Sequence, residues 1–116
     1  MKVSISTIDE FKRQARRLTK KYKSLKDDLK SFRDDLSENP FQGTDLGGGV
    51  RKIRMAIASK GKGKRGGARV LTLNVLVSDN ADVTLLTIYD KNEIDNVSDE
   101  YIQELVRDAK GLSSPQ

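Results

Sequence analysis

A cationic run interspersed with glycines is the most chemically informative segment of this sequence. The run SKGKGKRGGAR, residues 59–69, carries five positive charges and four glycines and has no acidic or aromatic side chain. Its glycines let backbone N–H groups approach an anion closely, and Lys52 and Arg54 extend the positive charge onto the preceding segment. Residues 51–69 hold eight of the 22 Lys and Arg side chains and no acid, so the rest of the chain sums to 14 minus 17, or −3. A basic stretch confined to one place predicts a ligand that carries phosphate.

The glycines of this run do not form a nucleotide-cofactor motif. Gly61, Gly63 and Gly66 fit the pattern G-x-G-x-x-G, but that fingerprint needs a helix immediately after it, whose N-terminus binds the pyrophosphate. The residues that follow predict a strand instead, and the absence of a Gly-Lys-Ser/Thr sequence excludes a P-loop. The chain has no cysteine, no histidine and no carboxylate spacing typical of a metal site. We therefore expect no nucleotide cofactor, no other cofactor and no metal.

Lysine and arginine side chains can assist one reaction without a metal, the cleavage of RNA by its own 2′-hydroxyl. Such a site aligns the attack, neutralises the charge that grows on phosphorus and helps the leaving oxygen. Crowded cations lower the pKa of a lysine and so favour a neutral amine, whereas arginine stays charged and acts as a clamp. The basic segment therefore has the side chains that RNA cleavage requires.

Tyr89, at the end of a predicted strand, has three possible roles. It can stack on a base, share a proton or fill the edge of the core. With three Tyr, three Phe and no Trp, the chain offers few side chains on which single-stranded RNA can stack. An RNA site in this protein would therefore gain from another body that holds the RNA.

The first half of the chain predicts a strand and two helices. Residues 2–5 predict a short strand, and Thr7 with Glu10 forms a capping box that predicts the start of a helix. Ser24 is suited to cap a second helix, which Asn39 and Pro40 end. Apolar residues recur at helical spacing in both segments: Ile8, Phe11, Ala15 and Leu18, then Leu25, Leu29, Phe32 and Leu36. The two helices are expected to form an antiparallel hairpin.

The second half predicts three strands and a last helix. After a glycine turn in TDLGGG, residues 52–57 alternate, so that Ile53 and its alternate neighbours are buried while Lys52 and Arg54 are displayed. Residues 70–77 and 83–89 follow as strands joined by a hairpin turn, the latter apolar enough for the centre of a sheet. A helix capped by Ser98 and ended by Gly111 completes the chain.

These elements predict an α+β fold with the order β-α-α-β-β-β-α. It consists of an antiparallel sheet, an N-terminal helical hairpin and a C-terminal helix, in a single domain over residues 1–110 with a flexible tail at 111–116. No apolar run is long enough to cross a membrane, and the chain begins without the apolar segment of a signal peptide. We expect a cytoplasmic protein with no membrane partner.

Two stretches resemble a known family. The runs RKIRMAIASKGKGKRGGARV at 51–70 and LLTIYDKNE at 85–93 are similar to the RelE/ParE superfamily of bacterial toxins, most closely to its HigB-type RelE branch. The resemblance implies the RelE-like fold and the toxin of a type II toxin–antitoxin pair. Such toxins are mRNA interferases: endoribonucleases that cleave mRNA in the ribosomal A site and inhibit translation. It also implies a cognate antitoxin protein, expected to cover the cationic groove or displace the last helix.

The resemblance also implies roles for individual residues. Lys52 and Arg54 match the basic pair on the strand that acts on the phosphate or in proton transfer, and Arg69 matches the arginine that stabilises the transition state. Lys91, just past the last strand, matches a further catalytic residue. The expected RNA-binding residues are Lys60, Lys62, Lys64, Arg65 and Tyr89. The C-terminal tyrosine that some relatives use has no clear counterpart, because Tyr101 is predicted to be structural, and the general base stays unassigned.

Two other functions fit the same residues. A ParE-like relative would inhibit DNA gyrase without being an enzyme. A passive RNA-binding module would bind single-stranded RNA with the strong salt dependence of phosphate contacts and would never cut it. The basic loop and strand favour the RNA-cleaving toxin over the gyrase inhibitor.

Overall fold

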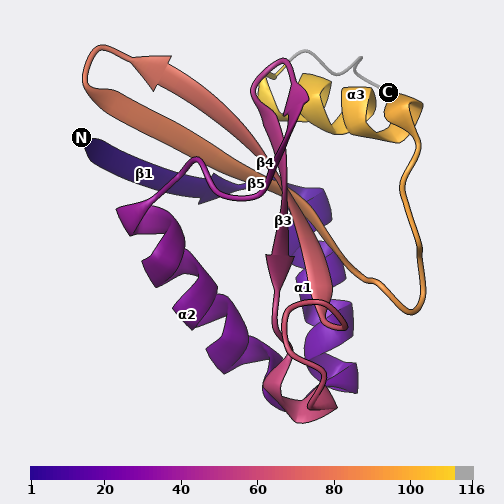
Figure 1. Cartoon of the computed structure of the whole chain (residues 1–116). Coiled ribbons are helices and arrows are strands. Elements are labelled where there is room, and N and C mark those ends of the chain that lie inside the picture. The colour runs from indigo at the N-terminus through magenta and orange to yellow at the C-terminus, as the bar shows by residue number, and fades with distance from the viewer. Residues whose placement is uncertain (112–116) are drawn as a thin grey trace.

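The computed structural model describes residues 1–111 and forms one sheet with helices on both faces (Figure 1). The predicted tail at 111–116 lies, except for its first residue, outside the described residues. The elements are β1 (Lys2–Thr7), α1 (Asp9–Lys21), α2 (Leu25–Glu38), β2 (Thr44–Gly47), β3 (Val50–Met55), one turn of 3-10 helix (Ala58–Lys60), β4 (Ala68–Val77), β5 (Asn80–Asp90) and α3 (Asp99–Ala109). The predicted α+β class and the predicted elements are confirmed, with one strand added.

The sheet has the strand order β1-β5-β4-β3-β2 and is mixed. Strands β2 to β5 pair antiparallel with their neighbours, but β1 pairs parallel with β5, with Val3 opposite Ala81 and Ile5 opposite Val83. The prediction of a wholly antiparallel sheet is therefore wrong. In this register Val3 and Ile5 pack against the apolar cluster that α1 and α2 cover. Alternation within one strand predicts which side chains share a face, but it does not predict whether the neighbouring strand runs parallel or antiparallel.

Strand β2 is the element that the sequence did not predict. Its four residues are all exposed and lack the apolar alternation of a strand, so the segment was interpreted only as a turn. In the structure β2 pairs with the first half of β3, with Thr44 opposite Lys52. The turn between them uses Gly47, Gly48 and Gly49, all with positive φ, which glycine adopts without strain.

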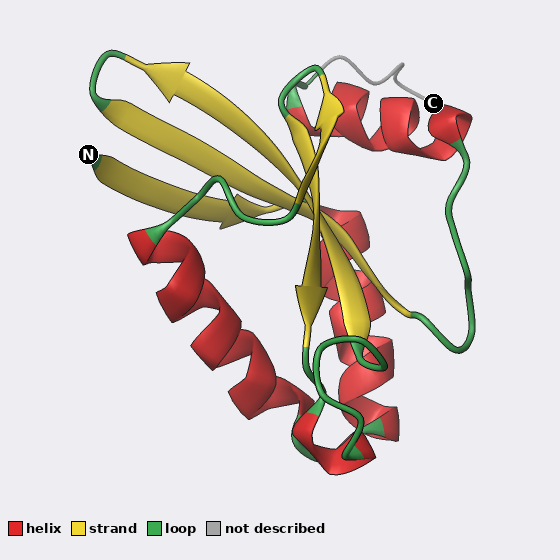
Figure 2. Ribbon diagram, in the orientation of Figure 1, coloured by secondary structure: helices red, strands yellow, loops and turns green. Residues whose placement is uncertain are grey.

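The two faces of the sheet carry separate apolar clusters. Figure 2 shows the helices that cover these faces. Helices α1 and α2 cover one face, packing Phe11, Leu18 and Leu36 against Ile53 and Ile88. Figure 1 shows these helices meeting at their connecting turn and spreading apart from it. Helix α3 covers part of the opposite face, where Ile102, Leu105 and Val106 pack in one buried cluster with Leu71, Leu86 and Tyr89. Helix α3 leaves Arg54 of β3 exposed on that face.

Two of the three predicted helix caps differ from prediction. Thr7 belongs to β1, so α1 begins after Ile8 without a side-chain cap, and Glu10 accepts a hydrogen bond from Tyr101 instead of completing a capping box. Ser24 is the N-cap residue of α2, but its hydroxyl donates to Asp28 rather than capping the helix. Ser98 caps α3 as predicted, since its hydroxyl accepts from the Tyr101 amide at 3.1 Å.

We expect Gly67→Ala to destabilise the fold markedly. An added Cβ would lie 2.1 Å from the Met55 carbonyl oxygen, in a buried contact where β3 and β4 diverge. Overpacking of this kind costs about 1–3 kcal/mol, so thermal unfolding should occur several degrees lower. Gly61→Ala is the control, because its Cβ would meet nothing within 4 Å and only the positive φ would oppose it. Equal unfolding midpoints for the two variants would contradict this packing.

Candidate nucleic-acid interface

Three strands place cations and a tyrosine in one row on the face that α3 partly covers. In β3, Ile53 and Met55 are buried against the helices, so Lys52 and Arg54 point to the opposite face. The β3–β4 register sets Arg54 opposite Arg69, and the β4–β5 register sets Arg69 opposite Tyr89. The structure thus brings together four residues that are spread over 38 positions of the sequence, counting from 52 to 89.

Arg69 ties the basic loop to the sheet. It is 6% exposed, and its guanidinium donates to the carbonyl oxygens of Lys64 at 3.3 Å, Arg65 at 3.1 Å and Ala68 at 3.2 Å. Burial, together with the neighbouring Arg54 charge, lowers the pKa of Arg69 from its usual value. A guanidinium has more N–H donors than these three bonds use, so Arg69 can hold the loop and still meet an anion.

Tyr89 lies in the core beneath α3. Its ring is 3% exposed and packs with Leu105 and Ile102, and its hydroxyl is buried with no hydrogen-bond partner among the described residues. Burial raises the pKa of Tyr89 above its ordinary value, although the nearby Arg69 charge acts in the opposite direction. Of the three roles open to Tyr89, this placement favours filling the core, because stacking on a base would require α3 to move.

Lys60 lies apart from the other loop lysines, in a buried ion pair. Its side chain is 6% exposed, and its ammonium donates to the Asp90 carboxylate at 2.8 Å and lies 5.5 Å from the centre of the Tyr22 ring. The carboxylate, which is 0% exposed, also accepts from the Tyr22 hydroxyl and from the Asn92 amide at 2.9 Å. Lys60 is therefore placed to anchor the loop rather than to contact RNA.

The pKa of Asp90 reflects this setting. Burial by itself raises it, but hydrogen bonds from Lys60, Tyr22 and the Asn92 amide outweigh burial and lower the pKa of Asp90 to about 2. Asp90 was not among the residues predicted for the site. Its position directly after a long apolar strand is the signal that it lies at a buried strand end, and nothing in the sequence indicates its partner.

The loop is also tied to α2, and its remaining cations project from it. The Ser59 amide donates to the Ser24 hydroxyl at 2.9 Å, and the Ala58 amide donates to the Asp28 carboxylate at 3.2 Å. The exposed cations of the loop are Lys62, Lys64 and Arg65. Lys91 lies at the base of the loop, where its amide donates to the Gly67 carbonyl at 3.2 Å, and is half-buried.

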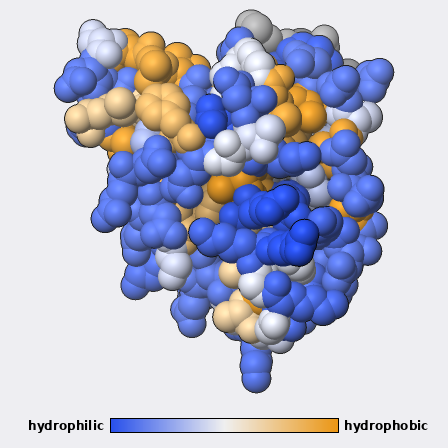
Figure 3. Space-filling model, in the orientation of Figure 1, coloured by the Kyte–Doolittle hydropathy of each residue, from blue (hydrophilic) through white to orange (hydrophobic). Residues whose placement is uncertain are grey.

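A groove runs beside Lys52 and Arg54 of β3. It measures about 430 Å³ and is lined by Lys52, Arg54 and Lys64 together with Gln42 and Thr44. Figure 3 shows the most hydrophilic side chains gathered near the centre of this view of the molecule. The groove brings strand cations and a loop cation to one concave surface, which suits a ligand with several phosphates.

The comparison with known families decides which family this is. The family described as "RelE toxin of RelE / RelB toxin-antitoxin system" matches residues 5–115, nearly the whole chain. The chain belongs to the RelE toxin family. Membership implies an antitoxin partner, whereas the HigB-type branch within the superfamily is not distinguished by this match.

A solved structure has the same fold as this RelE-family chain. The Escherichia coli toxin RelE, as a double arginine-to-alanine mutant in the free state, superposes with a TM-score of 0.58 at 14% sequence identity. The match covers 92% of this chain and 97% of the other. The RelE-like architecture predicted from the sequence is therefore confirmed.

In this RelE-family chain, α3 is held against the body by Tyr101. The Tyr101 hydroxyl donates to Glu10 at 2.7 Å and lies 3.2 Å from the Thr87 hydroxyl, which joins α3 to α1 and β5. Burial raises the pKa of Tyr101 to about 12, and the Glu10 carboxylate acts in the same direction. These contacts fit the structural role predicted for Tyr101.

Two further observations concern metals and membranes. Over residues 1–111, no group of three or more acidic side chains is arranged to hold a metal ion. Among the helices of the same range, none has the length and hydropathy to cross a membrane.

Proposed function

We propose that this RelE-family chain is the toxin of a type II toxin–antitoxin pair and acts as a ribosome-dependent mRNA endonuclease that inhibits translation. The observation that carries the proposal is the row in which Arg54 lies opposite Arg69, with Lys52 two residues earlier on the same face of β3, beside a groove that Lys64 also lines. This row offers several cations to one phosphate and its neighbours, which is what cleavage without a metal requires.

In the proposed reaction the 2′-hydroxyl oxygen attacks the adjacent phosphorus and its proton passes to a base. The bond from phosphorus to the 5′-oxygen breaks, and this oxygen takes up a proton, leaving a 2′,3′-cyclic phosphate. Arg54 and Arg69, opposite each other on neighbouring strands, bind the non-bridging oxygens and stabilise the growing charge. Lys52 and Lys91 remain proposed catalytic residues, and Lys62, Lys64 and Arg65 bind the backbone of the RNA.

The ribosome supplies the grip on RNA that this site lacks. With Tyr89 buried under α3, the described residues of the groove offer no exposed aromatic ring for stacking, so unaided binding of single strands should be weak. The antitoxin is proposed to cover the groove or to displace α3. A HigB-type branch and a cytoplasmic location stay predictions.

Arg54→Ala is the cleanest test, because Arg54 is exposed and its side chain makes no hydrogen bond or ion pair within the described fold. On induction, the wild type should arrest growth and produce new in-frame mRNA ends by primer extension. In the variant, mRNA cleavage should be at least about tenfold lower, because one cation that stabilises the transition state is gone. Arg33→Ala, which removes an exposed arginine from α2, should retain wild-type activity.

Other outcomes of this experiment would overturn the proposal. Growth arrest with intact mRNA and altered DNA topology would indicate a ParE-like gyrase inhibitor. No arrest, together with salt-dependent RNA binding, would indicate a passive RNA-binding module.

A further inference from the structure

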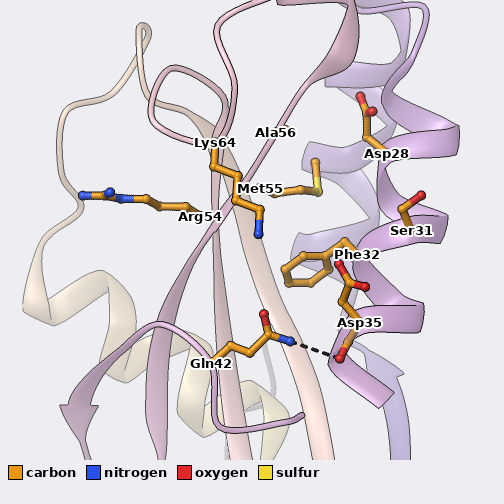
Figure 4. Close-up of a pocket in the computed structure, with 9 residues that line it drawn as sticks. All are labelled: Asp28, Ser31, Phe32, Asp35, Gln42, Arg54, Met55, Ala56 and Lys64. Carbon is orange, nitrogen blue, oxygen red and sulfur yellow. Dashed lines mark hydrogen bonds between the residues drawn. The ribbon is translucent and has the colours of Figure 1, made fainter. Parts of the chain in front are cut away.

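A second cavity opens from the cationic groove, between β3 and α2. It measures about 210 Å³, and its floor is apolar because Phe32 and Met55 lie there (Figure 4). Three residues, Gln42, Arg54 and Lys64, line both this cavity and the groove, so the two spaces are neighbours. A ligand with phosphates in the groove can therefore extend a neighbouring group into the cavity.

One wall of the cavity is an open strand edge. Strand β2 pairs with β3 only as far as Lys52, so β3 has no neighbour on that side beyond this residue. The Lys52 carbonyl points toward β2, since a Cβ on Gly43 would lie 2.2 Å from its oxygen. By the alternation of a strand, the Arg54 N–H and C=O point the same way and are free to pair with a ligand.

The opposite wall is rich in hydrogen-bond acceptors. Gln42 donates its amide N–H groups to the carbonyl oxygens of Asp35 at 3.1 Å and Asn39 at 2.9 Å, which leaves its own Oε1 toward the cavity (Figure 4). Asp35, whose carboxylate lies beside Phe32 (Figure 4), and Ser31 also line this space, and both residues are exposed. The Asp28 carboxylate is already engaged by Ala58 and Ser24.

We propose that this cavity receives one base of the bound RNA and favours a base with an exocyclic amino group over uracil. An amino group on adenine, cytosine or guanine donates to carboxylate and amide oxygens, as Asp and Glu accept from the cytosine amine in other complexes. Uracil carries carbonyl oxygens at the corresponding positions, which the Asp35 carboxylate would repel. The inference rests on the proposed function and adds a base preference to it.

A cationic protein side chain is the competing occupant, and charge disfavours it. The Lys64 ammonium reaches toward the cavity (Figure 4), so a lysine or arginine entering there would meet a like charge. An RNA strand would meet the Lys64 cation with its phosphates instead. The order of charges, positive at the mouth and negative at the inner wall, therefore fits a nucleotide.

Binding of short RNA homopolymers tests the base preference without cleavage or ribosomes. Fluorescence anisotropy at low salt would compare oligo(A), oligo(C) and oligo(U) of equal length. The wild type should bind the adenine and cytosine strands at least about fivefold more tightly than the uracil strand, the effect of one specific base contact. Asp35→Asn should reduce this ratio toward one.

Asp34→Asn is the matched control. Asp34 precedes Asp35 on α2, is equally exposed and lines no part of this cavity. Because both variants lose one negative charge, both should bind all RNA somewhat more tightly, and only Asp35→Asn should change the ratio between bases. Circular dichroism melting would show that both variants fold.

The outcomes distinguish failure of the base preference from failure of the proposed function. Equal binding of all three strands by the wild type, or a ratio that Asp35→Asn leaves unchanged, would overturn the base preference alone. Absence of binding to any strand at low salt would also overturn the base preference, whereas ribosome-dependent cleavage is tested separately by Arg54→Ala. Binding of a tetralysine peptide that is lost in Asp35→Asn, with no base preference, would assign the cavity to a cationic side chain instead.

Discussion

Replacing Arg69 by alanine should lower mRNA cleavage at least about a hundredfold, because the substitution removes two functions at once. It deletes the cation opposite Arg54 that is proposed to bind the reacting phosphate, and loss of one preorganised charge of this kind costs about 10²–10³ in rate. It also releases the carbonyl oxygens of Lys64 and Arg65, which hold the loop at the end of β4. The measurement is single-turnover cleavage of mRNA on purified ribosomes.

Arg69→Lys separates the two functions. Lysine keeps the positive charge but cannot reach several carbonyl oxygens in the fixed geometry of a guanidinium. We expect this variant to regain part of the cleavage that Arg69→Ala loses, while trypsin cuts both variants faster than the wild type at Lys62, Lys64 and Arg65. Wild-type cleavage by Arg69→Ala would remove Arg69 from the proposed site, and unchanged trypsin cutting would show that it does not hold the loop.

The strand cations were predictable because alternation is a local property. Burial of Ile53 and Met55 on one face forces Lys52 and Arg54 onto the other, and the structure confirms that arrangement. Alternation cannot give the register between strands. The sequence therefore did not reveal that Arg69 lies opposite Arg54 and Tyr89, although the resemblance to the family named Arg69 and Arg54 together.

Burial and partners were harder to predict than position along the chain. Lys60 lies in a run of lysines that the sequence predicts to be exposed. In the structure it is buried because it pairs with Asp90, 30 residues later in the chain. The burial of Tyr89 has a similar origin, because it depends on α3 folding back over the end of β5. Contacts between residues far apart in the sequence decided both cases, and local patterns carry no information about them.

Loss of the Asp90 carboxylate is the largest stability effect that we expect. In Asp90→Asn the Lys60 ammonium would stay buried without its counter-charge, and breaking a buried ion pair from one side costs about 3–5 kcal/mol. Lys21, 3.6 Å from the same carboxylate, would lose a partner too. Urea denaturation at neutral pH should show this loss, and Asp82→Asn, an exposed position on the same strand, should be nearly neutral.

The pH dependence of stability gives a second readout of the same pair. The pKa of Asp90 is lowered to about 2 in the folded protein, below its ordinary value of 3.8, so the folded state favours the charged carboxylate. The resulting stabilisation, about 2 kcal/mol, is fully present above pH ~4 and is lost as the pH falls through ~2. Other carboxylates titrate in this range, so the difference between the wild type and Asp90→Asn isolates the contribution of Asp90. The two denaturation curves should approach each other as the pH falls from ~4 to ~2, and a constant gap over that interval would mean that the carboxylate is not held in its charged form by Lys60 and Tyr22.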